Sequence, residues 1–68
     1  MYDKSFYRTV FNEMKPIIKI TCFCDDLNIQ KSNLSRFLKD SAYDDVMSLQ
    51  SLDNLYNSII QSLNHFVL

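Results

Sequence analysis

A group of polar and basic residues between positions 31 and 39 suits the recognition of DNA bases. The group consists of Lys31, Ser32, Asn33, Ser35, Arg36 and Lys39. Lys and Arg side chains donate hydrogen bonds to guanine, and an Asn side chain can make two hydrogen bonds with adenine. The alternative is that these residues form the ordinary solvated face of a surface helix. Both interpretations require a helix over this segment.

Other kinds of chemistry find less support in the sequence. Cys22 and Cys24 are two positions apart, so on a helix they point in different directions and cannot form a disulfide. We expect two reduced thiols that act as small apolar residues. A zinc site needs about four ligands, and only the distant His65 could join them. Because no acid and base stand at catalytic spacing, we expect no enzymatic activity and no cofactor.

Length and composition bound the fold. The chain of 68 residues is 47% hydrophobic, which predicts one folded domain over residues 1–68 and excludes a disordered tail. It has no glycine, which excludes Gly-rich phosphate-binding loops. No apolar run is long enough to cross a membrane, and no signal-peptide pattern is seen. We therefore expect no membrane association and a cytoplasmic location.

The net charge of −1 hides an uneven distribution along the chain. All seven basic residues lie within residues 1–39, together with four acids, so this part carries +3. Residues 40–68 hold the other four acids and no Lys or Arg, so they carry −4. This asymmetry can mark a basic binding face with an acidic back, or it can arise by chance in a small domain.

Apolar residues recur at helical spacing through most of the chain, so we expect an all-α fold, a compact bundle of four to five helices. The first helix should begin after Asp3 as N-cap and end near Met14, because Pro16 cannot continue it and forces Lys15 out of the helical region. Asn28 suits a left-handed turn after a helix. The other expected elements are helices over residues 20–27 and 31–39, a loop or one turn over 41–47, and a last helix that begins after Ser48.

The stretch ITCFCDDLNIQKSNLSRFL, residues 20–38, resembles the helix-turn-helix of the lambda-repressor-like family, which includes phage Cro and C-repressors. Residues 23–24 look like the family's Leu-Ala pair, residues 27–29 like its Leu-Gly-Ile turn, and residues 34–38 like the end of its recognition helix. The resemblance implies a DNA-binding regulator. Base contacts would come from Lys31, Ser32, Asn33, Ser35 and Arg36, and phosphate contacts from Lys39, Lys19 and Lys15.

The sequence departs from the family pattern at several positions. Lys19 and Ile20 stand where the family usually has Thr-Gln, so Lys19 could still contact a phosphate but Ile20 could not. Gln30 is a weaker N-cap than the usual Ser or Thr. Asp25 and Asp26 put negative charge on the helix expected to lie against the DNA backbone, where it would oppose binding.

The C-terminal segment is unusually apolar. Ile60, Val67 and Leu68 add a second apolar edge to the last helix, and the chain ends with the three apolar residues Phe66, Val67 and Leu68. They could fold back onto the first helix. They could also form a two-fold dimer interface, which would suit a protein that binds two DNA half-sites.

Two functional hypotheses follow. The first is a dimeric, sequence-specific regulator that binds operator DNA through the major groove, encoded by a phage or another mobile element. The second is a helix-turn-helix scaffold of a small phage protein that binds and inhibits a host protein, as an antirepressor or an inhibitor of a CRISPR nuclease. The overall acidity, Asp25, Asp26 and the −4 tail favour the second hypothesis.

Overall fold

The computed structural model describes residues 2–67, and the side chains of residues 2–64. Three α-helices and two short 3-10 helices make up this part of the chain, and it contains no strand. The elements, in chain order, are α1 (Lys4–Met14), η1 (Ile20–Phe23), α2 (Lys31–Lys39), η2 (Ser41–Val46) and α3 (Leu49–Val67). The expected all-α class and compact form are therefore confirmed, with a radius of gyration of 11.4 Å.

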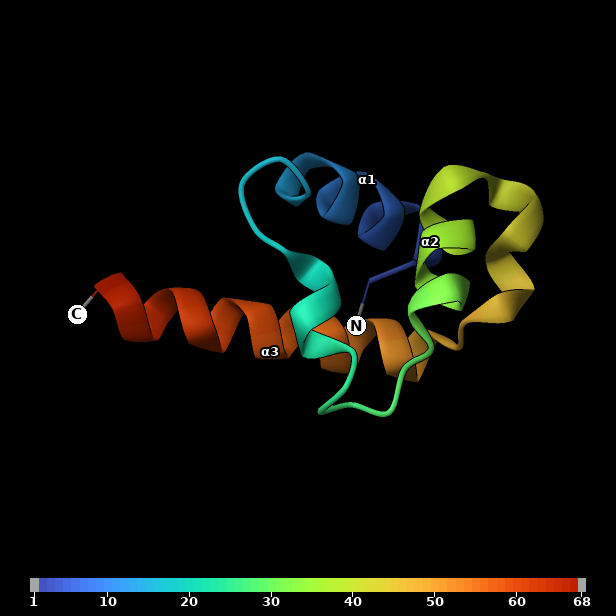
Figure 1. Ribbon diagram of the computed structural model, residues 1–68. Helices are drawn as coiled ribbons and strands as arrows, with labels where there is room; N and C mark the ends of the chain where they lie inside the picture. Colours follow the sequence, from blue (N-terminus) through green and yellow to red (C-terminus); the bar gives the residue numbers. More distant parts are fainter. Residues whose placement is uncertain (1, 68) are drawn as a thin grey trace.

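Helix α3 runs along one side of the molecule, and the other elements pack on its N-terminal half (Figure 1). Its C-terminal half extends beyond them. The core lies where α1, η1, α2 and α3 meet. Its buried members are Tyr7, Phe11, Ile20, Cys24, Leu34, Phe37, Leu38, Met47, Leu52, Leu55 and Ile59.

The ends of α1 and α3 follow local sequence signals. The Asp3 carboxylate accepts a hydrogen bond from the Phe6 N–H at 2.8 Å, and the Ser48 hydroxyl accepts one from the Ser51 N–H at 3.1 Å. Both expected N-caps are confirmed.

Helix α1 ends at Met14, as expected. Lys15 nevertheless keeps helical dihedral angles (φ −50°, ψ −45°), so the expected exclusion of Lys15 from the helical region is wrong. The helix ends because Pro16 has no N–H to continue the hydrogen-bond ladder.

The α-helix predicted over residues 20–27 is wrong in type and in length. Only Ile20–Phe23 are helical, and they form a 3-10 helix whose N-cap position, Lys19, provides no side-chain hydrogen bond. Asp25 and Asp26 would also place negative charge at the C-terminal end of an α-helix, where the helix dipole opposes it. Residues 24–27 are turns instead.

The turn before α2 has the hydrogen bonds of a Schellman motif. The Ile29 N–H donates to the Cys24 carbonyl at 2.9 Å, and the Asn28 N–H donates to the Asp25 carbonyl at 3.4 Å. Asn28 has a φ of 58°, which confirms the expected left-handed conformation. This turn reverses the chain and sets where α2 begins.

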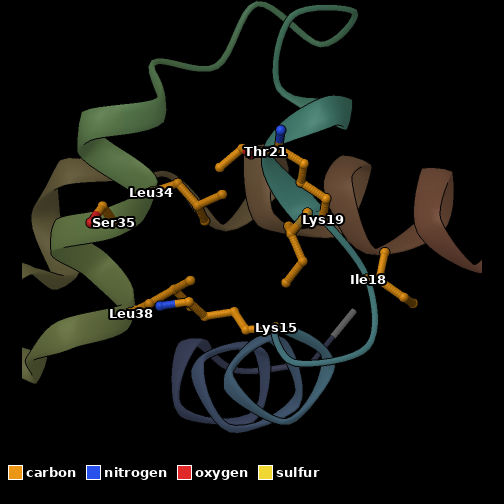
Figure 2. A pocket seen from close by; sticks show the side chains of 8 residues that line it. Lys15, Ile18, Lys19, Thr21, Leu34, Ser35 and Leu38 are labelled. Carbon is orange, nitrogen blue, oxygen red and sulfur yellow. The ribbon is translucent and has the colours of Figure 1, made fainter.

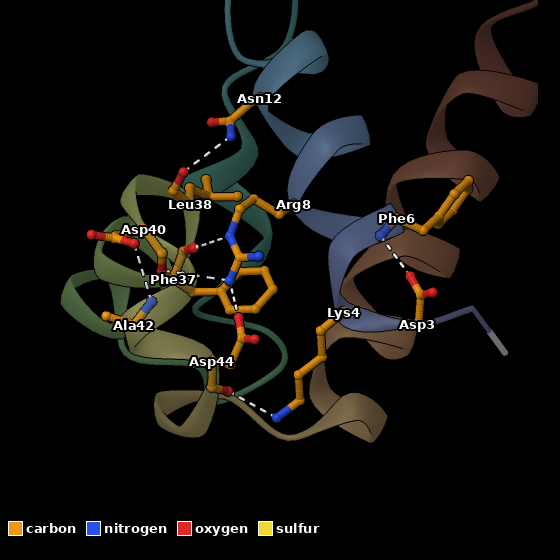
Figure 3. Close-up of polar contacts among 10 residues, drawn as sticks. All are labelled: Asp3, Lys4, Phe6, Arg8, Asn12, Phe37, Leu38, Asp40, Ala42 and Asp44. Carbon is orange, nitrogen blue, oxygen red and sulfur yellow. Dashed lines mark hydrogen bonds and ion pairs between the residues drawn. The ribbon is translucent and has the colours of Figure 1, made fainter.

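Two side chains of α1 hold the C-terminal end of α2 (Figure 3). The Arg8 Nε donates to the Phe37 carbonyl at 2.8 Å, and the Asn12 amide donates to the Leu38 carbonyl at 3.0 Å. The Arg8 guanidinium also forms an ion pair with Asp44 and lies 4.5 Å from the centroid of the Phe37 ring. These contacts satisfy carbonyls at a helix end that have no partner within the helix.

The Arg8 ion pair also attaches η2 to α1. The ammonium group of Lys4 donates to the Asp44 carbonyl at 2.8 Å, so two residues of α1 bind the same residue of η2. On the other side of α1, the Tyr7 hydroxyl donates to the Asp53 carboxylate of α3 at 2.8 Å. Burial raises the pKa of the Tyr7 hydroxyl, and this hydrogen bond raises it further.

We predict that Arg8→Ala lowers the free energy of unfolding by about 2–3 kcal/mol, because it removes a charged hydrogen bond and an ion pair at the end of α2. Arg8→Lys should recover only part of this loss, since a lysine cannot bond the Phe37 carbonyl and the Asp44 carboxylate in the same planar geometry. Urea denaturation followed by circular dichroism measures both changes. A loss below about 0.5 kcal/mol for Arg8→Ala would contradict the role given to Arg8.

A second prediction concerns the turn. Asn28→Ala should destabilise the protein by about 1 kcal/mol, because an alanine at a positive φ brings its Cβ too close to the backbone. Asn28→Gly should not destabilise it, since glycine adopts this conformation freely. Asn64→Ala, at an exposed helical position of α3, is the matched control and should have little effect on the melting temperature. Equal losses for the alanine and glycine variants of Asn28 would contradict the argument.

Candidate nucleic-acid interface

The exposed face of α2 carries the residues that the sequence singled out. Leu34, Phe37 and Leu38 are buried on the opposite side of the helix. The exposed residues are Lys31, Ser32, Ser35, Arg36 and Lys39. Their spacing places them along a single face of the helix, because residues three to four apart are neighbours on a helix surface.

Asn33 is the exception among the candidate base-contacting residues. It is half-buried, and its side-chain amide donates to the Gln30 side-chain oxygen at 3.3 Å. Asn33 therefore lies at the edge of the exposed face. Gln30, the N-cap position, gives no side-chain hydrogen bond to the first turn of α2, as expected of a weak N-cap.

The exposed face of α2 is strongly positive. Residues 31–39 include Lys31, Arg36 and Lys39 and no acidic residue. Arg36 and Lys39 lie in the last turn, where positive charge also interacts favourably with the helix dipole. Among the described residues, the side chains of Ser32, Ser35, Arg36 and Lys39 form no hydrogen bond or ion pair, so they are available to a ligand.

Lys31 is the member of this face that has an acidic partner. Its ammonium group lies 3.6 Å from the Asp25 carboxylate, and both side chains are largely exposed. An exposed pair of this kind contributes little to stability. Asp26 lies beside this pair in the chain and is also exposed. Negative charge therefore lies at the N-terminal end of the positive face.

Lys15 and Lys19, the other candidate phosphate contacts, lie before η1 and beside the middle of α2. Both are exposed, and together with Ser35 they border a cavity between the end of α1, η1 and α2 (Figure 2). The structure thus places Lys15, Lys19 and Ser35 around one opening. The sequence had indicated these residues separately, without the cavity between them.

The proposed dimer residues are only partly described. Ile60 is half-buried, and Leu63, about one turn further along α3, is 38% exposed. The side chains of Phe66 and Val67, and all of Leu68, lie outside the described residues.

The two cysteines are both free. Cys22 is exposed, and Cys24 is buried in the core, where burial raises the pKa of its thiol. Cys24 thus acts as a small apolar residue that lets η1 approach the rest of the core. Within the described part of the chain, no three His, Cys, Asp or Glu side chains gather as metal ligands would.

Sequence reasoning missed the residues that hold the site in place. Arg8 and Asn12 are one helical turn apart on α1 and lie directly beside the buried Tyr7 and Phe11. Their position beside an apolar stripe could have indicated that these polar side chains contact a neighbouring helix. Their partners on α2 are more than 25 residues away in the chain, since Asn12 and Leu38 are 26 positions apart.

Comparison with known proteins provides no relative: no family model, curated protein or solved structure matches this chain. The helices of the described chain include none that is long and apolar enough to cross a membrane.

We predict that alanine substitutions on the exposed face leave the fold intact. Ser32→Ala, Ser35→Ala and Arg36→Ala should each change the free energy of unfolding by no more than about 0.5 kcal/mol, because these side chains make no contact that stabilises the fold. Phe37→Ala, next to Arg36 in sequence but fully buried, is the matched control and should lose about 3–5 kcal/mol. Thermal and urea denaturation compare the four variants. A large loss for Arg36→Ala would show that this residue has a structural role instead.

Proposed function

We propose that this protein is a sequence-specific DNA-binding transcriptional regulator that inserts α2 into the major groove of operator DNA. The observation that carries the proposal is the exposed face of α2, which holds three positive charges and no acid while the opposite face is buried. An α-helix fits the major groove, and side chains of the types found here can bond to base edges.

The arrangement of η1, the turn at Asn28 and α2 supports assignment to the helix-turn-helix class. Two helical segments are joined by a short turn, and the second has an exposed polar and basic face. The first segment, the 3-10 helix Ile20–Phe23, is shorter than the helix expected from the sequence over residues 20–27. In this proposal Lys31, Ser32, Ser35 and Arg36 contact bases, Asn33 contacts them from the edge of the face, and the set of lysines at 15, 19 and 39 contacts phosphates.

We further propose that the protein binds DNA as a homodimer through the extended part of α3. Ile60 and the terminal residues Phe66, Val67 and Leu68 would form the interface, and the partial exposure of Leu63 supports an apolar contact there. A two-fold dimer would place two α2 helices in successive major grooves, about 34–36 Å apart.

A second candidate function is binding to a host protein instead of DNA. The observation that favours it is the pairing of Lys31 with Asp25, beside the exposed Asp26. These carboxylates would repel a DNA phosphate but attract a basic protein surface. The two functions make opposite predictions for substitutions at Arg36 and Asp26.

The decisive experiment selects duplexes from a random library and measures binding by mobility shift at stated salt concentrations. We expect an inverted-repeat operator whose half-sites are one helical turn apart. Arg36→Ala should weaken operator binding by about 1–3 kcal/mol and relax the preference at one base position. Asp26→Asn should strengthen binding to all duplexes, because it removes repulsion of the phosphates.

Gln50→Ala, at an exposed position near the N-terminal end of α3 and away from the proposed dimer segment, is the control and should bind the operator as the unmodified protein does. Selection of no motif, together with no shift at low salt, would refute the regulator proposal. Unchanged operator affinity in Arg36→Ala would remove Arg36 from the interface. Weaker capture of one host protein by Asp26→Asn, with no effect of Arg36→Ala, would support the second candidate.

A further inference from the structure

A cavity of about 200 Å³ opens between the end of α1, η1 and α2. Its apolar part is formed by Ile18, Ile20, Leu34 and Leu38, and its polar part by Lys15, Lys19, Thr21 and Ser35. Figure 2 shows Lys15 and Lys19 approaching it from different sides, with the side chains of Leu34 and Leu38 extending from α2 toward them. Ser35 also lines the cavity, but its hydroxyl points away from the two lysines in this view. An apolar interior between two ammonium groups suits a ligand that combines an apolar group with negative charge.

The two lysines of this cavity carry positive charge that no lining residue offsets. Neither Lys15 nor Lys19 forms an ion pair among the described residues, and none of the eight lining residues is acidic. The ion pairs that do form in this part of the chain involve Arg8 and Lys31. Both lysines are therefore free to bind an anionic group that approaches the opening.

The size of the cavity indicates the kind of ligand. Pockets for drug-sized molecules usually measure about 300–1,000 Å³, so this one suits a single large side chain better than a whole small molecule. Ile17, in the same loop as Ile18, is 84% exposed and adds apolar surface outside the cavity. A small ligand held inside the cavity would leave this surface uncovered, whereas a protein segment could cover it.

We infer that the cavity is a docking site for an acidic protein segment that inserts one large apolar side chain and places carboxylates beside Lys15 and Lys19. Insertion of an apolar side chain from a helical or extended segment is a common mode of peptide recognition. The buried anchor would provide most of the binding free energy. The two lysines would select for segments that have acidic residues beside the anchor.

The site also suggests a form of regulation, and this part rests on the proposed function. Lys15, Lys19 and Ser35 belong both to the cavity and to the proposed DNA interface. A segment docked there would cover these residues and bring carboxylates close to the DNA phosphates. The acidic segment and operator DNA would therefore compete for the protein.

The direct test uses the whole chain, labelled with ¹⁵N, and the synthetic peptide SDEDFLEDS. We expect saturable changes in the amide resonances of Lys15, of residues 17–21 and of Ser35 as the peptide is added. The peptide SDEDSSEDS keeps the charge but lacks the apolar anchor, and SKKKFLKKS keeps the anchor but reverses the charge. Both should bind at least tenfold more weakly, and equal binding of either one would overturn the proposal, as would no saturable change with the first peptide.

Variants of exposed residues test the site without threatening the fold. The double variant Lys15→Gln, Lys19→Gln should bind SDEDFLEDS at least tenfold more weakly. Its matched control, Gln50→Glu with Gln61→Glu, changes the net charge equally at two exposed positions of α3 and should retain most of the affinity. Ser35→Leu adds bulk at a residue that lines the cavity and should weaken binding at least tenfold while leaving both lysines in place. If the control loses as much affinity as the lysine variant, or if Ser35→Leu binds normally, the proposal fails.

Octanoate tests the alternative of a free amphiphile. If it binds at the same residues as tightly as the peptide does, the inference of a protein segment is overturned. Because these titrations contain no DNA, they succeed or fail independently of the proposed function. The regulatory part has its own test: SDEDFLEDS should displace the selected operator from the protein, and SDEDSSEDS should not.

Discussion

The contact between Arg8 and the C-terminal end of α2 is the constraint on which the positions of the other elements depend. The last carbonyls of a helix have no partner within it, and here α1 supplies donors to two of them from Arg8 and Asn12. The same guanidinium group packs on the Phe37 ring and binds Asp44 of η2. One half-buried side chain thus joins α1, α2 and η2. Since α1 also bonds to α3 through Tyr7 and Asp53, the orientation of α2 is tied to the whole core.

This constraint explains how a small domain presents a rigid, charged surface. Leu34, Phe37 and Leu38 fix which side of α2 is buried, and the Arg8 contacts fix its C-terminal end. The N-terminal end is set by the left-handed turn at Asn28. The helix then presents basic and polar side chains on its remaining face, where Ser32, Ser35, Arg36 and Lys39 are exposed. This separation allows the exposed face to be specialised for a ligand at little cost to the fold.

The balance of charge around α2 gives the two proposals a common physical basis. Positive charge lies on the exposed face of the helix and at Lys15 and Lys19, while Asp25 and Asp26 lie near its N-terminal end. Duplex DNA and an acidic protein segment both require positive charge. The cavity favours the protein segment over DNA at this place, because its interior is apolar. An apolar side chain can fill such an interior, whereas a phosphate group cannot.

The sequence by itself determined the elements that depend on near neighbours: the two caps at Asp3 and Ser48, the end of α1 before Pro16, the turn at Asn28 and the buried face of α2. The caps, the helix end and the turn arise from hydrogen bonds or steric limits within a few residues, and the buried face of α2 follows from the helical spacing of its apolar residues. Only the tertiary structure decided that Arg8 meets Asp44 and that Lys15, Lys19 and Ser35 surround one cavity. These features join residues far apart in the chain, and their positions follow from packing that no local pattern encodes.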